Sequence, residues 1–174
     1  MKKKFFNAKI YRNEDATEII VENGKISQIG TDLPKCDEEI DLNGKLVLPP
    51  YVDPHLHLDY VYTLSELGQE GAGSGTLFEA IELWPQFKKT LTVESVKRLA
   101  MKGIKDEVSQ GVQHIRTHID VTDPNFTALK AMLEMKQDLK DIVDIQIVAF
   151  PQEGMYMYKG GRDLVEEALK MGAD

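Results

Sequence analysis

Short alternating runs of apolar and polar residues fill the first 48 positions of the chain. Residues 18–22 and 25–29 are two such runs, and the dipeptide Asn23-Gly24 lies between them. Because Asn and Gly both tolerate a positive φ, this dipeptide favours a type I′ turn. The pattern therefore predicts a β-hairpin over residues 18–29.

A second Asn-Gly dipeptide lies at Asn43-Gly44, between the alternating residues 39–42 and the mainly apolar residues 45–48. By the same reasoning it predicts a further antiparallel pair in a small sheet. Pro49 and Pro50 follow at once, and proline cannot donate to a strand ladder. We therefore expect the first domain to cover residues 1–49.

Beyond Pro50 the pattern changes to apolar strands that alternate with amphipathic helices. Apolar residues recur at helical spacing after Thr92, a suitable N-cap, and Gly111 ends that helix. Pro85 is expected to break the preceding helix or to start a second helical segment. Three strands alternating with helices predict an α/β fold with parallel βαβ units over residues 50–174. The predicted strands span residues 52–58, 112–120 and 142–150, and the predicted helices begin near Thr76, Thr92, Asp123-Pro124 and Asp163.

Composition narrows the class of protein. The 174 residues are 42% hydrophobic and 29% charged, typical of a globular protein that does not enter a membrane. The net charge of −8 argues against nucleic-acid binding and favours a small-molecule substrate. Cys36 is the only cysteine, which excludes a disulfide framework and a cysteine-based zinc site, and fits a reducing cytoplasm.

The candidate metal ligands are His55 and His57. Side chains at i and i+2 of a strand share a face, so both imidazoles would point the same way from the first predicted strand. Most His-x-His pairs are ordinary core or surface histidines. Here the chain has four histidines in all, and this pair follows a double proline in an apolar strand that is expected to be buried and central. That context favours a site for one divalent ion.

Other candidates follow the second and third predicted strands, because binding groups gather at the carboxyl ends of parallel strands. His118 lies there, where packing or hydrogen bonding is a more natural role than that of a third ligand. Gln152 offers a donor and an acceptor to a planar heterocycle, although it also suits an ordinary polar loop. Glu153 is either a general acid or base, or a solvated side chain.

The glycine-rich turn at 73–76 precedes the first predicted helix. It resembles a phosphate-binding turn at a helix N-terminus, but it lacks the lysine of a P-loop.

Several segments together resemble the amidohydrolase superfamily, and within it the bacterial cytosine deaminases. The His55-Leu56-His57 motif resembles the metal-binding His-x-His at the end of the first barrel strand. The resembling segments, in the same order as in that family, are residues 74–79, 114–121, 127–134 and 145–154.

This resemblance implies the N-terminal part of a (β/α)8 TIM barrel, about three βα units, preceded by strands of a small β-sandwich. It implies hydrolytic deamination of cytosine, or of a related cyclic amidine, by a metal-activated water. His55 and His57 would bind iron or zinc, Gln152 would hydrogen-bond the pyrimidine, and Leu77 would contact the substrate.

Family members take further ligands and catalytic groups from later barrel strands, beyond the position of Asp174. We therefore expect the 174-residue chain to be inactive alone, and to associate with the C-terminal part or with copies of itself. The alternatives are a noncatalytic, self-associating half-barrel binding module and an amidohydrolase that acts on another heterocycle.

Overall fold

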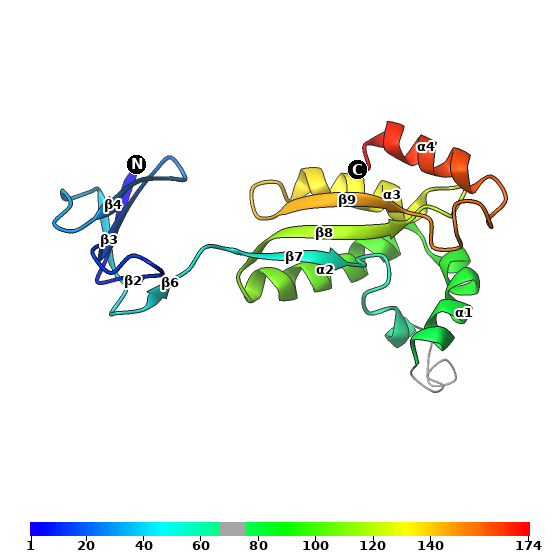
Figure 1. The fold of residues 1–174 in the computed structure, drawn as a ribbon, viewed down its shortest axis with the longest axis horizontal. Coiled ribbons are helices and arrows are strands. Elements are labelled where there is room, and N and C mark those ends of the chain that lie inside the picture. Colours follow the sequence, from blue (N-terminus) through cyan, green and yellow to red (C-terminus); the bar gives the residue numbers. More distant parts are fainter. Residues whose placement is uncertain (67–75) are drawn as a thin grey trace. The chain divides into compact units, whose positions relative to one another are not determined.

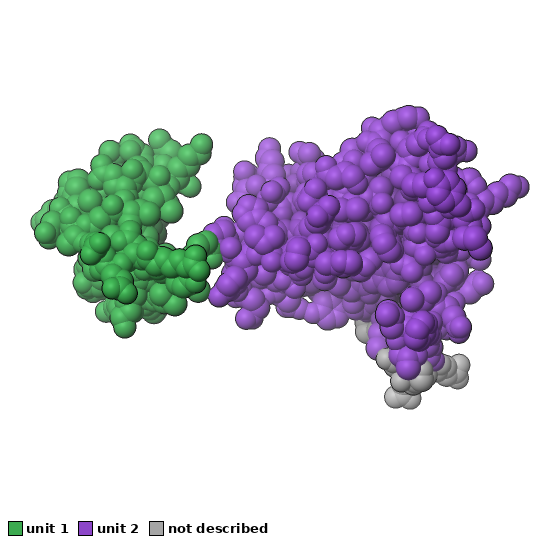
Figure 2. All heavy atoms as spheres, in the orientation of Figure 1, with its two compact units in different colours: residues 1–49 green, residues 50–174 purple. Residues whose placement is uncertain are grey.

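The computed structural model describes residues 1–66 and 76–174 of the chain. These residues form two compact units, Met1–Pro49 and Pro50–Asp174, which Figure 2 shows in different colours. The predicted glycine-rich turn at 73–76 lies mostly outside the described residues. No helix in the described ranges has the length and apolar character that crossing a membrane requires.

The first unit holds two small sheets (Figure 1). In the larger one the order is β4-β3-β1-β5, and the smaller one pairs β2 with β6. Their bounds are β1 (Lys2–Phe6), β2 (Lys9–Ile10), β3 (Glu18–Glu22), β4 (Lys25–Gly30), β5 (Glu38–Asp41) and β6 (Leu46–Val47).

The two Asn-Gly dipeptides behave differently. Asn23 and Gly24 have φ values of 53° and 77° and join antiparallel β3 and β4, so the predicted hairpin is confirmed. Asn43 and Gly44 also have positive φ, but β5 pairs in parallel with β1, and β6 pairs in parallel with β2. The predicted antiparallel pair at this second turn is therefore wrong, because a local turn signal does not determine which strands outside it become partners.

The second unit is built on a parallel three-stranded sheet in the order β7-β8-β9, as the alternating pattern predicted. Helices α2 and α3 cover one face of this sheet, and α4 packs on β9 (Figure 1). The elements are β7 (Tyr51–Leu56), η1 (Thr63–Glu66), α1 (Leu77–Phe87), η3 (Lys88–Thr90), α2 (Val93–Ser109), β8 (Val112–Asp120), α3 (Thr127–Asp138), β9 (Asp144–Phe150) and α4 (Gly161–Met171).

Alternation along β8 separates the core from the opposite face of the sheet. Ile115, Thr117 and Ile119 are buried under the helices, whereas His118 lies on the other face at the carboxyl end. β7 was predicted to be a buried central strand, and this is wrong for the described chain. Its one partner is β8, and Val52 is 61% exposed.

Helix limits follow local chemistry with two exceptions. Thr92 and Ser95 form a capping box at the start of α2, and Gly111 beyond its end has φ of 91°. Pro85 was expected to break α1 or to start a second segment, but it lies within the last turn of α1. The helix expected to open at Asp123-Pro124 begins at Thr127, where the Asp123 carboxylate accepts the backbone N–H at 2.8 Å.

Candidate active site

His55 and His57 converge at the carboxyl end of β7. His57 is the first residue beyond the strand, and the Nε2 atoms of the two rings are 3.3 Å apart. Two nitrogens that each bind one zinc ion at about 2.0–2.1 Å, at a tetrahedral angle, are about 3.3–3.4 Å apart. The two imidazoles therefore have a spacing that fits a shared divalent ion.

His118 meets this pair from the end of β8 by ring packing. Its ring stacks on that of His55, with centroids 4.1 Å apart and planes inclined by 21°. Such a stack is the packing role considered for His118 from the sequence. Among the described residues, no group of three or more His, Cys, Asp or Glu side chains is arranged to hold a metal ion.

The surroundings of His57 and His118 favour the neutral form of each ring. Burial, followed by the neighbouring rings of His55 and His118, lowers the pKa of His57 below its ordinary value. Burial, followed by His55, also lowers the pKa of His118. The Nδ1 atoms of His57 and His118 are buried without a hydrogen-bond partner in the described part of the chain. A neutral imidazole with a free lone pair is the form that binds metals.

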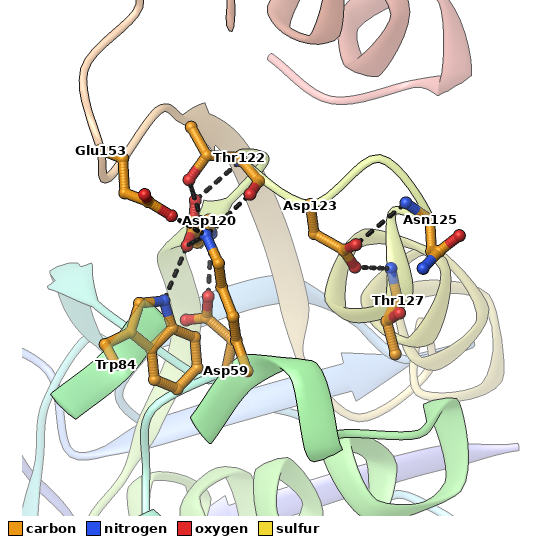
Figure 3. A network of polar contacts seen from close by, with 9 residues as sticks. Asp59, Trp84, Asp120, Thr122, Asp123, Asn125, Thr127 and Glu153 are labelled. Atoms are coloured by element: carbon orange, nitrogen blue, oxygen red, sulfur yellow. Dashed lines mark hydrogen bonds and ion pairs between the residues drawn. The ribbon is translucent and has the colours of Figure 1, made fainter. Parts of the chain in front are cut away.

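A second polar cluster lies at the same sheet edge and centres on Asp120, which is 3% exposed (Figure 3). One carboxylate oxygen of Asp120 accepts from Trp84 Nε1 at 2.7 Å and from Lys88 Nζ at 3.1 Å. The other accepts from the backbone N–H and the hydroxyl of Thr122. The Asp120 backbone N–H donates to Asp59 at 2.8 Å. This network joins the ends of β7 and β8 to helix α1.

Lys88 extends the network to the segment that follows β9. Its ammonium donates to the backbone oxygen of Thr122 at 2.7 Å and to the Thr122 hydroxyl at 3.0 Å, and it forms an ion pair with Glu153. Burial lowers the pKa of Lys88, but the hydrogen bonds and charges of Glu153 and Asp120 outweigh burial and raise this pKa above its ordinary value. Lys88 is therefore a buried, charged lysine.

Two further buried groups lie beside this network. Burial raises the pKa of Asp59 to about 7, and one of its carboxylate oxygens has no hydrogen-bond partner within the described residues. Burial also raises the pKa of Tyr60, whose hydroxyl is likewise without a described partner. The Tyr60 ring stacks on Trp84 and meets the edge of His57.

The two predicted substrate-binding residues have different surroundings. Gln152 is partly buried in the turn after β9, where its backbone N–H donates to the oxygen of Phe150 at 3.1 Å. The Phe150 ring meets those of His57 and His118, with centroids 5.3 and 6.0 Å apart, which brings this turn close to the histidines. Leu77 is the first residue of α1 and is 73% exposed.

Sequence reasoning missed Lys88 and the polar role of Trp84. Trp84 fits the apolar face of the helix predicted near Thr76, and its indole N–H gives no pattern that can be detected in a sequence. Lys88 is followed by Lys89, which is exposed and contacts Gln86 in the adjoining turn. No local signal distinguishes the buried lysine from the exposed one.

Comparison with known proteins agrees with this architecture. Residues 38–172 match the amidohydrolase family. The chain belongs to this family. It is 42% identical to 5-methylcytosine deaminase from Klebsiella pneumoniae, whose structure with 5-fluorocytosine superposes with a TM-score of 0.85 over 98% of this chain. N-isopropylammelide isopropylaminohydrolase from Burkholderia multivorans is 26% identical, with a TM-score of 0.81 over the whole chain.

A curated relative has nearly the same name as the Burkholderia enzyme. N-isopropylammelide isopropyl amidohydrolase from Pseudomonas sp. strain ADP is 37% identical over 140 residues, or 79% of this chain. The chain spans 35% of that relative's length, 42% of the Klebsiella structure and 44% of the Burkholderia structure. The α/β unit therefore matches the N-terminal part of amidohydrolase TIM-barrel proteins.

Proposed function

We propose that this chain carries metal-binding and ring-binding residues of a hydrolase that deaminates cytosine or a related cyclic amidine. Water adds to the ring carbon that bears the amino group and ammonia leaves, so that cytosine and water give uracil and ammonia. The observation that carries the proposal is the 3.3 Å separation of the His55 and His57 Nε2 atoms at the carboxyl end of β7. The similarity to a 5-methylcytosine deaminase supports this substrate class.

Each proposed residue has a distinct role. His55 and His57 hold one divalent ion, iron or zinc, through neutral imidazole nitrogens. When bound, such an ion supplies Lewis acidity that lowers the pKa of a water molecule toward neutrality. Gln152 pairs its amide with an adjacent C=O and N–H of the ring, and Leu77 contributes an apolar contact. Burial lowers the pKa of His57, which favours the neutral ring that an ion needs.

We further propose that the 174-residue chain alone does not turn over cytosine. A catalytic zinc site generally takes three protein ligands, whereas two histidines converge here, and the chain spans 42% of the Klebsiella deaminase. The test is ammonia release from cytosine by the isolated chain with added zinc or iron. Sustained turnover would refute the proposed inactivity.

Ring binding is tested on the same chain by calorimetric titration with cytosine at saturating zinc. We expect Gln152→Ala to weaken cytosine binding about tenfold, since the paired hydrogen bonds are lost. Gln146→Ala, at an exposed position of β9, is the matched control and should bind normally. Parallel titrations with 5-methylcytosine and N-isopropylammelide identify the preferred ring. Equal cytosine binding by Gln152→Ala and the unchanged chain would contradict the role of Gln152.

A further inference from the structure

Lys88 is a buried cation for which the proposed reaction has no role. Its side chain is 9% exposed, and its ammonium contacts acceptors that follow two different strands. Asp120 and Thr122 stand at and just after the end of β8, while Glu153 follows β9. The neighbouring Lys89 is exposed and contacts Gln86 one turn away. The tertiary structure therefore gives these adjacent lysines different surroundings.

The segment after β9 is the part that Lys88 could hold in place. Within this segment the Gln152 and Gly154 N–H groups close local turns on Phe150 and Pro151. Lys88 connects the segment to the rest of the unit in two ways, through the ion pair with Glu153 and through its position 5.6 Å from the centroid of the Tyr158 ring. Charge-assisted hydrogen bonds are about twice as strong as neutral ones.

Glu153 is the immediate neighbour of Gln152, so the ion pair restrains the backbone that carries the Gln152 amide. Figure 3 shows Glu153 and Asp120 pointing toward one another from different segments, and both side chains accept from the Lys88 ammonium. Asp120 is held in turn by Trp84 and Thr122, so the ammonium is anchored to a rigid strand end.

We propose that Lys88 is a positioning residue that holds the segment 151–158 against the end of β8, and thereby orients Gln152 for ring recognition. The orientation of Gln152 toward a ring rests on the function proposed above. The restraint on the segment does not depend on it.

Hydrogen–deuterium exchange on the 174-residue chain tests the restraint directly. Lys88→Met removes the ammonium, and Glu153→Gln removes the negative charge from a group that is 30% exposed. We expect amides in 151–158 to exchange about tenfold faster in both variants, because each variant lacks the Lys88–Glu153 ion pair that links this segment to the end of β8. Amides of α2 should keep their rates in Glu153→Gln. Lys89→Met is the matched control and should exchange like the unchanged chain.

Two variants keep the test decisive. Lys88→Met leaves Asp120 buried without its cation, so this variant can unfold as a whole, and exchange would then rise in α2 as well. Glu153→Gln changes a more exposed side chain and leaves Asp120 paired with Lys88, so it decides the test if Lys88→Met unfolds. The proposal is overturned if Glu153→Gln exchanges in 151–158 no faster than Lys89→Met.

Cytosine titration at saturating zinc separates this proposal from the proposed function. Weaker cytosine binding by Glu153→Gln, with zinc binding unchanged, supports the positioning of Gln152. If Glu153→Gln exchanges faster in 151–158 but binds cytosine as the unchanged chain does, the proposed positioning of Gln152 is overturned. Failure of the unchanged chain to bind cytosine would count against the proposed substrate, while exchange would still decide whether Lys88 restrains the segment.

Discussion

Two polar clusters lie at the same edge of the β7-β8-β9 sheet, and they differ in how far their polar atoms are satisfied. In the histidine cluster the rings of His55, His57 and His118 contact one another, and two Nδ1 atoms have no described partner. In the Asp120 cluster, each carboxylate oxygen of Asp120 accepts two hydrogen bonds.

The difference separates two kinds of polar site. Neutral rings whose Nε2 atoms converge suit a ligand that binds from outside, such as a metal ion. A carboxylate with four donors has no capacity left for an external ligand, and it suits a permanent link between segments. The histidine cluster is thus the part available for chemistry, and the Asp120 cluster is the part that holds its surroundings in place.

The largest expected effect comes from breaking the Asp120 cluster. Asp120→Ala leaves the buried Trp84 N–H without its acceptor and removes one of the two carboxylates that contact the Lys88 ammonium. We expect a loss of about 3–5 kcal/mol in the free energy of unfolding. Urea denaturation followed by the fluorescence of Trp84, the only tryptophan, measures it. Asp144→Ala, at an exposed position at the start of β9, is the control. A loss below about 1 kcal/mol would show that the network contributes little.

The histidine cluster should respond in ligand affinity rather than in stability. His57→Ala removes one of two converging nitrogens, and we expect zinc affinity to fall by more than the roughly tenfold typical of losing a supporting group. Competition with a chromophoric chelator measures this affinity. His114→Ala removes an exposed histidine near the opposite end of the sheet and should bind zinc normally. Equal zinc affinities of His57→Ala and His114→Ala would indicate that zinc binds elsewhere.

Asp59 accepts from the Asp120 backbone, and the pH dependence of stability tests its raised pKa. Burial raises its pKa from 3.8 to about 7 in the folded chain. Between pH 3.8 and about 7, Asp59 is protonated in the folded chain and ionised in the unfolded chain. Proton binding by Asp59 therefore stabilises the folded chain at about pH 4, and this stabilisation is lost as the pH rises through about 7. We expect Asp59→Asn to remove that dependence.

The measurement for Asp59 is the difference in unfolding free energy between the unchanged chain and Asp59→Asn, taken from urea titrations at several pH values. Relative to the Asn variant, the unchanged chain should gain stability as pH falls from about 7 to about 4. A difference that stays constant over this window would rule out the raised pKa.

The smallest effect is expected at Tyr60, whose buried hydroxyl has no described partner. Tyr60→Phe removes no described hydrogen bond, so we expect a stability change within about 0.5 kcal/mol. Trp84→Phe, by contrast, loses a bond to a charged carboxylate and should cost about 1.5–3 kcal/mol. Thermal unfolding of both variants compares them. A large loss in Tyr60→Phe would place its hydroxyl in a satisfied network like that of Asp120.

Local rules in the sequence predicted the elements whose conformation depends on near neighbours. Asn23-Gly24 determines a hairpin through two positive φ angles, and Thr92 determines a helix start through its cap. The i, i+2 spacing of His55 and His57 predicted that both rings lie on one side, and their Nε2 atoms are 3.3 Å apart although His57 lies just beyond β7. These features need no knowledge of distant segments.

The tertiary structure decided the rest. It selected parallel partners for the strands around Asn43-Gly44, gave β7 one described neighbour, and buried Lys88 while leaving Lys89 exposed. The physical reason is that strand pairing and the burial of a charge depend on groups far away in the chain. Lys88 remains buried and charged because Asp120 and Glu153, 32 and 65 residues away in the chain, supply its counter-charges.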